Sequence, residues 1–443
     1  MPRRTLFHFL SNYGMLVVLI LLCIYYAVAT MTEQTPRGAE GAADVAEQLD
    51  DAADGPVLIV TRANPQDILF AEALTVRINA LGRTVGATLQ GEPPAVRAAW
   101  EGLPQGAAVV VATTPDYGSV VGALKARIPG YADVPVVAPR SYIWPTFMRV
   151  DNLRNVANQI AVIAIIAVGM TMVIITAGID LSVGSLIALS AVVAAWLIRS
   201  MGGTDAGFGA MFGASLAAIL MCGLVGFFSG VTITRFNVPP FIATLGIMQV
   251  ASGIAYIIAE GESIYEIPDA YVWLGRGADL FSIPNAVLLM VVIYGLAHIL
   301  MSHTTLGRYI YAVGGNPEAA RLSGIRVDAV LLFVYTLCGI LAGLGGVVQA
   351  SQLKSGAPTY GLLYELYVIA AVVVGGTSLA GGEGKILGTL IGAFIIAVIQ
   401  NGMNLTGVES YTQKVVLGFV ILGAVLLDML KKKDWWQRRT QPG

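Results

Sequence analysis

The sequence predicts an all-α polytopic membrane protein of about ten transmembrane helices, with an α/β extracytoplasmic domain inserted between the first two. The 443 residues are 56% hydrophobic and only 12% charged, whereas soluble domains are roughly a quarter charged. Apolar runs of about 20 residues recur, and each is long enough to cross a bilayer. The stretch 31–150 breaks this pattern because it is far too polar to lie in a membrane.

The apolar runs define ten predicted spans. They are 10–30, 158–178, 183–199, 209–233, 240–259, 284–303, 328–350, 364–380, 386–402 and 413–430. Basic residues concentrate on the side of the N-terminus, so the positive-inside rule puts both termini in the cytoplasm. These basic residues are Arg3, Arg4, Arg235, Arg308, Arg321, Arg326, Lys385, Lys431, Lys432, Lys433, Arg438 and Arg439. The first run ends in AVAT and could pass for a signal peptide, but a retained first helix is the simpler interpretation.

Composition divides the chain into five predicted segments. Residues 1–30 are the first transmembrane helix, and 31–54 carry seven acidic residues against one arginine, which indicates a solvated linker or a frayed helix. In 55–144 short β-like runs such as PVLIV and AAVVVATT alternate with helical stretches, which is typical of βαβ units on a parallel sheet. Its candidates for exposed sugar platforms are Trp100, Tyr117 and Trp144. Residues 145–432 form the transmembrane permease domain, and 433–443 a cytoplasmic tail.

Motifs for chemistry within this chain are absent from the sequence. The three histidines lack metal-ligand spacing, and the three cysteines lie in apolar runs where no disulfide framework is implied. The glycine-rich GGTSLAGGEGK, Gly375 to Lys385, does not fit the GxxxxGK[ST] phosphate loop. We therefore expect no cofactor, no metal and no nucleic acid on this chain, and if ATP drives it, another polypeptide holds the ATP.

Four blocks occur in one order along the chain. They are GIDLSVGSLIALS, HTTLGRYIYAVGGNPEAARLSGI, YELYVIAAVVVGGTSLAGGEGKILGTLIGA and QNGMNLTGV. Together they resemble the permease subunit of ribose-type ABC sugar importers, over roughly 1–30 and 145–432. The resemblance implies a transport subunit of the bacterial plasma membrane rather than an enzyme, importing a monosaccharide or related small polar solute by alternating access. It also implies three partners: an ATPase subunit that binds ATP-Mg, a periplasmic sugar-binding protein, and a second permease, identical or paralogous.

The largest cytoplasmic loop, between the sixth and seventh spans, predicts a short helix. Asn316-Pro317-Glu318 is a helix start, with proline in the first turn and an acid near the positive helix end, and Gly324 ends it. The resemblance makes this the helix that couples to the ATPase, while the alternative is a solvated connector. The candidate coupling residues are Gly315, Asn316, Pro317, Glu318, Ala319, Ala320, Arg321, Leu322, Ser323 and Gly324.

GIDLSVGS places an aspartate between two apolar spans, at the predicted cytoplasmic turn. A charge there must face water, a helix end or a partner. Asp180 is therefore either a cap for the free N–H groups of the following helix or a gate at the inner mouth. The residues of this turn or gate are Gly178, Asp180, Ser182, Gly184 and Ser185. On the opposite side, Thr359, Tyr360 and Glu365 are candidates for the outer mouth or for contact with the binding protein, or Glu365 is simply a carboxylate facing water.

Two other functions stay open at this point. An ion-coupled secondary transporter would need acids at the membrane midplane, but Asp180 and Glu365 both map near span ends. A membrane receptor could sense through the α/β insert, although no signalling segment follows the last span.

Overall fold

The computed structural model describes residues 3–50, 54–104 and 106–432, so the predicted tail 433–443 lies outside the described residues. The chain forms two compact units. The insert unit is Met31–Pro145, and the helical unit contains Met1–Thr30 and Thr146–Gly443.

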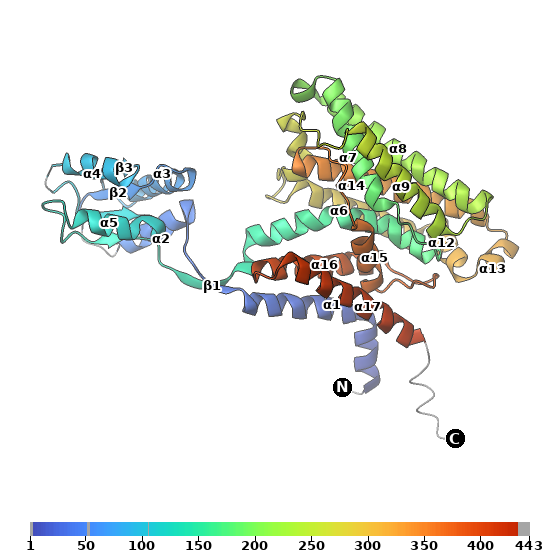
Figure 1. The fold of residues 1–443 in the computed structure, drawn as a ribbon. Helices are drawn as coiled ribbons and strands as arrows, with labels where there is room; N and C mark the ends of the chain where they lie inside the picture. The colour runs from blue at the N-terminus through green and yellow to red at the C-terminus, as the bar shows by residue number, and fades with distance from the viewer. Residues whose placement is uncertain (1–2, 51–53, 105, 433–443) are drawn as a thin grey trace. The chain divides into compact units, whose positions relative to one another are not determined.

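The insert unit is built on a four-stranded sheet in the order β3-β2-β4-β5, with every neighbouring pair parallel (Figure 1). Its strands are β2 (Val57–Thr61), β3 (Val85–Gln90), β4 (Val110–Thr113) and β5 (Val136–Val137). Helices α2 (Gly38–Asp50) and α3 (Pro65–Ala80) pack on one face, and α4 (Pro93–Glu101) and α5 (Gly118–Lys125) on the other. Strand β2 is buried on both faces, as expected for a central parallel strand. A separate antiparallel pair, β1 (Met31–Gln34) and β6 (Tyr142–Pro145), joins the two ends of the unit.

The segment 31–54 was predicted to be a solvated linker or a frayed helix, and the structure forms a helix there that is packed rather than frayed. Most of this segment is β1 and α2, and α2 buries Ala42, Val45 and Leu49 against the sheet and α3. These residues follow the i, i+3, i+7 spacing of one helix face, so the acids occupy the opposite, solvated face. Two of the predicted sugar platforms are also corrected, because Trp100 and Tyr117 are fully buried in the core of the insert.

The helical unit contains thirteen named α-helices among its described residues. They are α1 (Arg3–Ala29), α6 (Val150–Ile175), α7 (Val183–Ser200), α8 (Phe208–Arg235), α9 (Pro240–Ile258), α10 (Trp273–Arg276), α11 (Asn285–His303), α12 (Thr305–Gly315), α13 (Pro317–Leu322), α14 (Val327–Leu353), α15 (Tyr364–Val374), α16 (Ile386–Leu405) and α17 (Ser410–Lys432).

Seven of these helices, α6, α7, α8, α9, α11, α14 and α16, are long and apolar enough to cross a membrane, which makes the chain a helical polytopic membrane protein. Shorter apolar helices cover Gly14–Ala29, Tyr364–Val374 and Ser410–Leu426, where the first, eighth and tenth spans were predicted. The eighth span was predicted to run to residue 380, but α15 ends at Val374 after 11 residues. A helix of that length rises only about 16 Å, roughly half of the hydrocarbon core.

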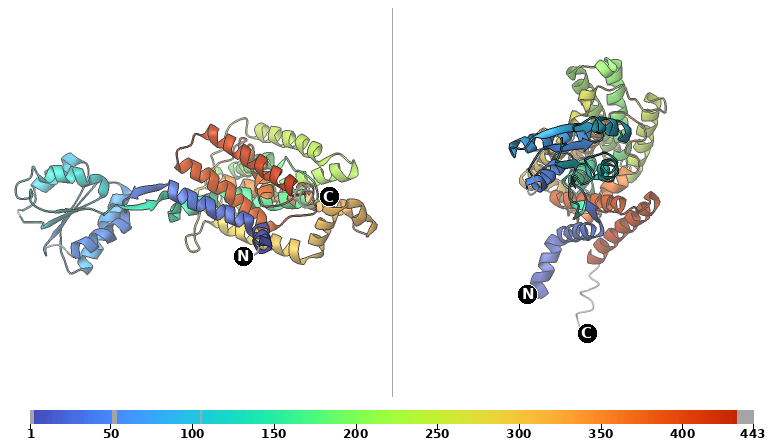
Figure 2. Two further views of the ribbon diagram at one scale, coloured as in Figure 1. Left: turned by 90° about the horizontal axis from the view of Figure 1, so that it is seen from below. Right: turned by 90° about the vertical axis from the view of Figure 1, so that its left-hand side faces the viewer.

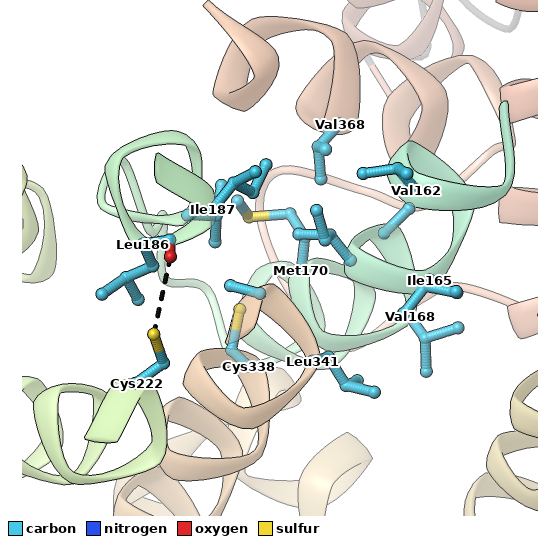
Figure 3. Close-up of a cluster of buried hydrophobic side chains, with 14 of the residues drawn as sticks. Val162, Ile165, Val168, Met170, Leu186, Ile187, Cys222, Cys338, Leu341 and Val368 are labelled. Atoms are coloured by element: carbon cyan, nitrogen blue, oxygen red, sulfur yellow. Dashed lines mark hydrogen bonds between the residues drawn. The ribbon is translucent and has the colours of Figure 1, made fainter. Parts of the chain in front are cut away.

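Helix α6 lies at the centre of the helical unit, in contact with α14, α16, α15 and α11. Its apolar side chains belong to one buried cluster with those of α7 and α14, part of which is drawn in Figure 3 with Met170, Leu186 and Leu341 labelled. Small residues let the backbones approach closely. A Cβ at Gly169 would lie 2.8 Å from the Cα of Cys338, for example. Helix α1 packs beside α16 (Figure 2), and the Tyr26 hydroxyl donates to the carbonyl of Ile399 at 3.4 Å.

Candidate functional site

The predicted helix start in the 303–325 loop is present as α13. The backbone of Asn316 is extended, and its side-chain oxygen accepts a hydrogen bond from the N–H of Ala319 at 3.0 Å. Pro317 occupies the first helical position, where no N–H is needed. Gly324 follows with a φ of +86°, a left-handed conformation that glycine adopts without strain. The local sequence therefore defines this short helix at both ends.

The outer surface of α13 is charged and exposed. Glu318 pairs with Arg321 at 3.2 Å, and the same arginine lies 3.6 Å from Asp328 at the start of α14. Leu322 is 89% exposed beside these charges. Exposed ion pairs of this kind contribute about 0–1 kcal/mol to folding. The charges are therefore free to serve a partner at little cost in stability.

The loop that carries α13 is joined tightly to the end of α6. A Cβ at Gly314 in α12 would lie only 1.7 Å from the carbonyl oxygen of Ile175, the last residue of α6. The same carbonyl accepts a hydrogen bond from the N–H of Gly382 at 2.8 Å. The Tyr311 hydroxyl donates to the carbonyl of Gly384, also at 2.8 Å. The backbones of α12, of the end of α6 and of the loop at Gly382 thus meet here without side chains between them.

Asp180 is fully buried, in the segment 176–182 that links α6 to α7. Its Oδ1 accepts hydrogen bonds from the backbone N–H of Ser182 at 2.9 Å and from the Ser182 hydroxyl at 2.6 Å. Among the described residues no N–H or O–H group donates to its Oδ2, and the Cys338 thiol of α14 is within hydrogen-bonding reach of the carboxyl group. The carboxyl group faces α14, close to Tyr335 and Cys338.

The structure differs from the predicted cap in one respect, because Asp180 does not bond to the N–H groups of the first turn of α7. Ser182 is the N-cap residue of α7 and makes no side-chain cap bond. Asp180 instead closes a turn onto the N–H of Ser182 itself and does not reach the first turn of the helix. The Ser185 hydroxyl donates to the Ser182 carbonyl at 2.8 Å. The carboxylate therefore stabilises the buried turn before the helix, and it does not face water.

The predicted inner turn and outer mouth are not on opposite sides of the spans. A Cβ at Gly184 would lie 2.3 Å from Oε2 of Glu365 and 2.6 Å from the carbonyl of Gly361. The first turns of α7 and α15 therefore touch inside the helical unit. The segment 354–363 runs along α7 to reach this point, since Gly356 packs against Ala191. Of the other two predicted outer residues, Tyr360 bonds through its hydroxyl to Ser355, and Thr359 is exposed.

The sequence reasoning missed a set of carboxamides near one end of the helical unit. Asn158 on α6, Gln349 and Gln352 on α14 and Gln400 on α16 line a common cavity. Polar residues are costly inside apolar spans, so the positions of these carboxamides in the sequence could have indicated a candidate site.

Comparison with known proteins decides the family. Residues 152–425 match the family described as the branched-chain amino acid transport system / permease component. The chain belongs to this permease family. It is 45% identical over 301 residues to the ribose import permease protein RbsC of Escherichia coli (strain K12), covering 67% of this chain and 91% of that protein. The RbsC of Bacillus subtilis (strain 168) is 44% identical over 293 residues, 66% of this chain and 88% of that protein.

Permeases named for other sugars are also similar. The D-allose transport system permease protein AlsC of Escherichia coli (strain K12) is 37% identical over 287 residues, 65% of this chain and 86% of that protein. No solved structure matches the chain. As a member of this family the chain is a transport subunit and not an enzyme. The insert unit, Met31–Pro145, precedes the matched region.

Proposed function

We propose that this chain is the membrane permease of an ABC importer that moves a monosaccharide, ribose or a close relative, into the cell. The observation that carries the proposal is the 45% identity to the ribose import permease RbsC along 91% of that protein's length. The similar allose and galactose permeases support a sugar as the substrate class.

Ten crossings follow if α1, α15 and α17 are added to the seven long helices. Helix α15 is too short alone, but the segment 354–363 before it follows α7 from Ala191, beside Gly356, to Gly184, beside Gly361, which adds about 10 Å at 1.5 Å per residue of α7. Together they are long enough to cross. The basic residues then put both termini in the cytoplasm, with α13 on the inner face and the insert unit outside.

Helix α13 is the proposed docking point for the ATPase. Its exposed charges and Leu322 suit a complementary cleft, and the close contacts of α12 with Ile175 carry a displacement to α6. ATP-Mg is bound by the ATPase subunits, and a sugar-loaded binding protein docks outside. A second permease, identical or paralogous, completes the pathway, which opens alternately to the two sides.

The test is reconstitution of the chain with its ATPase and binding protein in proteoliposomes. Sugar-loaded binding protein is expected to stimulate ATP hydrolysis and to drive uptake of D-ribose, D-allose or D-galactose. Uptake that needs an ion gradient and no ATP would refute the proposal in favour of a secondary transporter.

A further inference from the structure

A polar cavity of about 340 Å³ lies within the helical unit, between α6, α10, α14, α15 and α16. Its volume is near the lower end of the roughly 300–1,000 Å³ typical of small-molecule sites. Five of its lining residues are carboxamides: Asn158, Gln159, Gln349, Gln352 and Gln400. Such a concentration is costly to maintain in a membrane protein unless the groups are used.

One wall of the cavity is held rigid by its own hydrogen bonds. Gln352 Nε2 donates to the carbonyl of Asn158 at 2.8 Å, and Asn158 Nδ2 donates to the carbonyl of Gly275 at 3.0 Å. Arg276 Nε donates to the Gln352 carbonyl. These bonds tie α6, α10 and α14 together, so this wall keeps its shape without a ligand.

Two further carboxamides of the lining, Gln400 of α16 and Gln159 of α6, keep their hydrogen-bonding groups available. Gln400 is half-buried, and no hydrogen bond from its side chain is found among the described residues. The same holds for Gln159, which is exposed at the rim. Each carboxamide offers two N–H donors and one acceptor oxygen, which together match hydroxyl groups that both donate and accept.

The remaining lining suits the apolar face of a sugar ring. Tyr364 also lines the cavity, and its ring packs edge-on against Tyr367 with centroids 6.2 Å apart. Ile160, Ile163 and Ala397 supply aliphatic surface. Arg276 is the single charged residue among the twelve that line the cavity. The other polar groups of the lining are uncharged carboxamides and the Tyr364 hydroxyl, so a neutral polyhydroxylated solute finds uncharged hydrogen-bonding partners here.

We propose that this cavity is a binding site for a small neutral polyhydroxylated solute, a monosaccharide, with Gln400 and Gln159 as its recognition groups. The inference rests on the proposed function and specifies where the permease first holds its substrate. The cavity lies between the beginning of α6 and the ends of α14 and α16. In the proposed orientation this is the extracytoplasmic half, where a sugar leaves the binding protein.

The experiment uses the full chain assembled with its ATPase and binding protein in proteoliposomes, with radiolabelled D-ribose, D-allose and D-galactose as probes. Gln400→Leu and Gln159→Leu keep side-chain size and remove the carboxamide. Each is expected to lower kcat/KM for ATP-driven uptake about 2- to 10-fold, the effect of one lost hydrogen bond. ATP hydrolysis stimulated by the loaded binding protein is expected to stay within twofold of wild type. Gln249→Leu is the matched control, since Gln249 is an exposed residue of α9 away from the cavity, and it is expected to leave uptake unchanged.

Every outcome bears on the proposal. If both cavity variants take up sugar as wild type does, the site is refuted while the proposed function stands. If uptake and stimulated ATP hydrolysis fall in parallel, the carboxamides support structure and the site is likewise refuted. If a leucine variant does not assemble, Gln400→Asn is measured in its place. The shortened carboxamide is expected to lower the rate of sugar uptake, and an unchanged rate would refute the site. A wild-type complex that transports none of the three sugars refutes the proposed function itself.

Discussion

Replacing Asp180 separates a structural role of its carboxylate from a role in gating. Alanine removes both hydrogen bonds that Oδ1 accepts from Ser182, at 2.9 Å from the N–H and 2.6 Å from the hydroxyl. The hydroxyl can rotate to another acceptor, but the backbone N–H stays buried without a partner. A buried unsatisfied donor costs about 1–3 kcal/mol, so we expect Asp180→Ala to lower the free energy of unfolding by about 2 kcal/mol or slightly more.

Asparagine is expected to cost less than about 1 kcal/mol, because its side-chain oxygen can accept the same two bonds. Its new amide group replaces Oδ2 close to the Tyr335 hydroxyl, and neither of these two oxygens is bonded to an N–H or O–H group in the part of the chain that the structure describes. Ser182→Ala is the matched control, and it removes the hydroxyl bond alone for about 1 kcal/mol.

The measurement is SDS titration of the purified chain in mixed micelles, combined with ATP-driven uptake by the reconstituted complex. An Asp180→Ala variant as stable as wild type would refute the hydrogen-bond argument. An Asp180→Asn variant that is stable but transports nothing would show that the negative charge itself is needed, which is the gate alternative.

Three further predictions address the other sites. Gly184→Ala is expected to destabilise the chain by about 1–3 kcal/mol, since its Cβ would meet a carboxyl oxygen at 2.3 Å. Gly246→Ala on α9, where a Cβ meets nothing within 4 Å, is expected to be neutral or slightly stabilising in the same titration. Exchanging the charges of Glu318 and Arg321 is expected to weaken copurification of the ATPase and to change unfolding by less than about 0.5 kcal/mol; unchanged complex formation would make α13 a simple connector. Finally, a fragment covering 31–145 is expected to be soluble and monomeric in sedimentation, because both faces of its sheet are covered by its own helices. Calorimetry with this fragment is expected to detect no tight monosaccharide binding, and a micromolar affinity would contradict this and make the insert a sensor.

Features that depend on neighbouring residues could be predicted from the sequence. The long helices begin and end within three residues of the predicted spans, apart from α6, which begins eight residues earlier, because about 20 apolar residues cannot remain in water. Helix α13 was predicted to start at Asn316-Pro317 because its cap is made by atoms three residues apart. The packing of α2, where a linker or a frayed helix was predicted, also has a local cause. The prediction was based on the number of charges in this segment and overlooked the apolar stripe of Ala42, Val45 and Leu49, although its helical spacing is visible in the sequence.

Tertiary structure alone decided which of these elements touch. Gly184 and Glu365 are 181 positions apart, and only the path of 354–363 along α7 brings them together. The carboxamides of the cavity come from α6, α14 and α16, and none of them forms a motif with its sequence neighbours. The same holds for Asp180, whose burial depends on α14 packing over the turn. Apolar length and helix capping are properties of a short stretch of chain, whereas burial and close approach depend on the packing of distant helices.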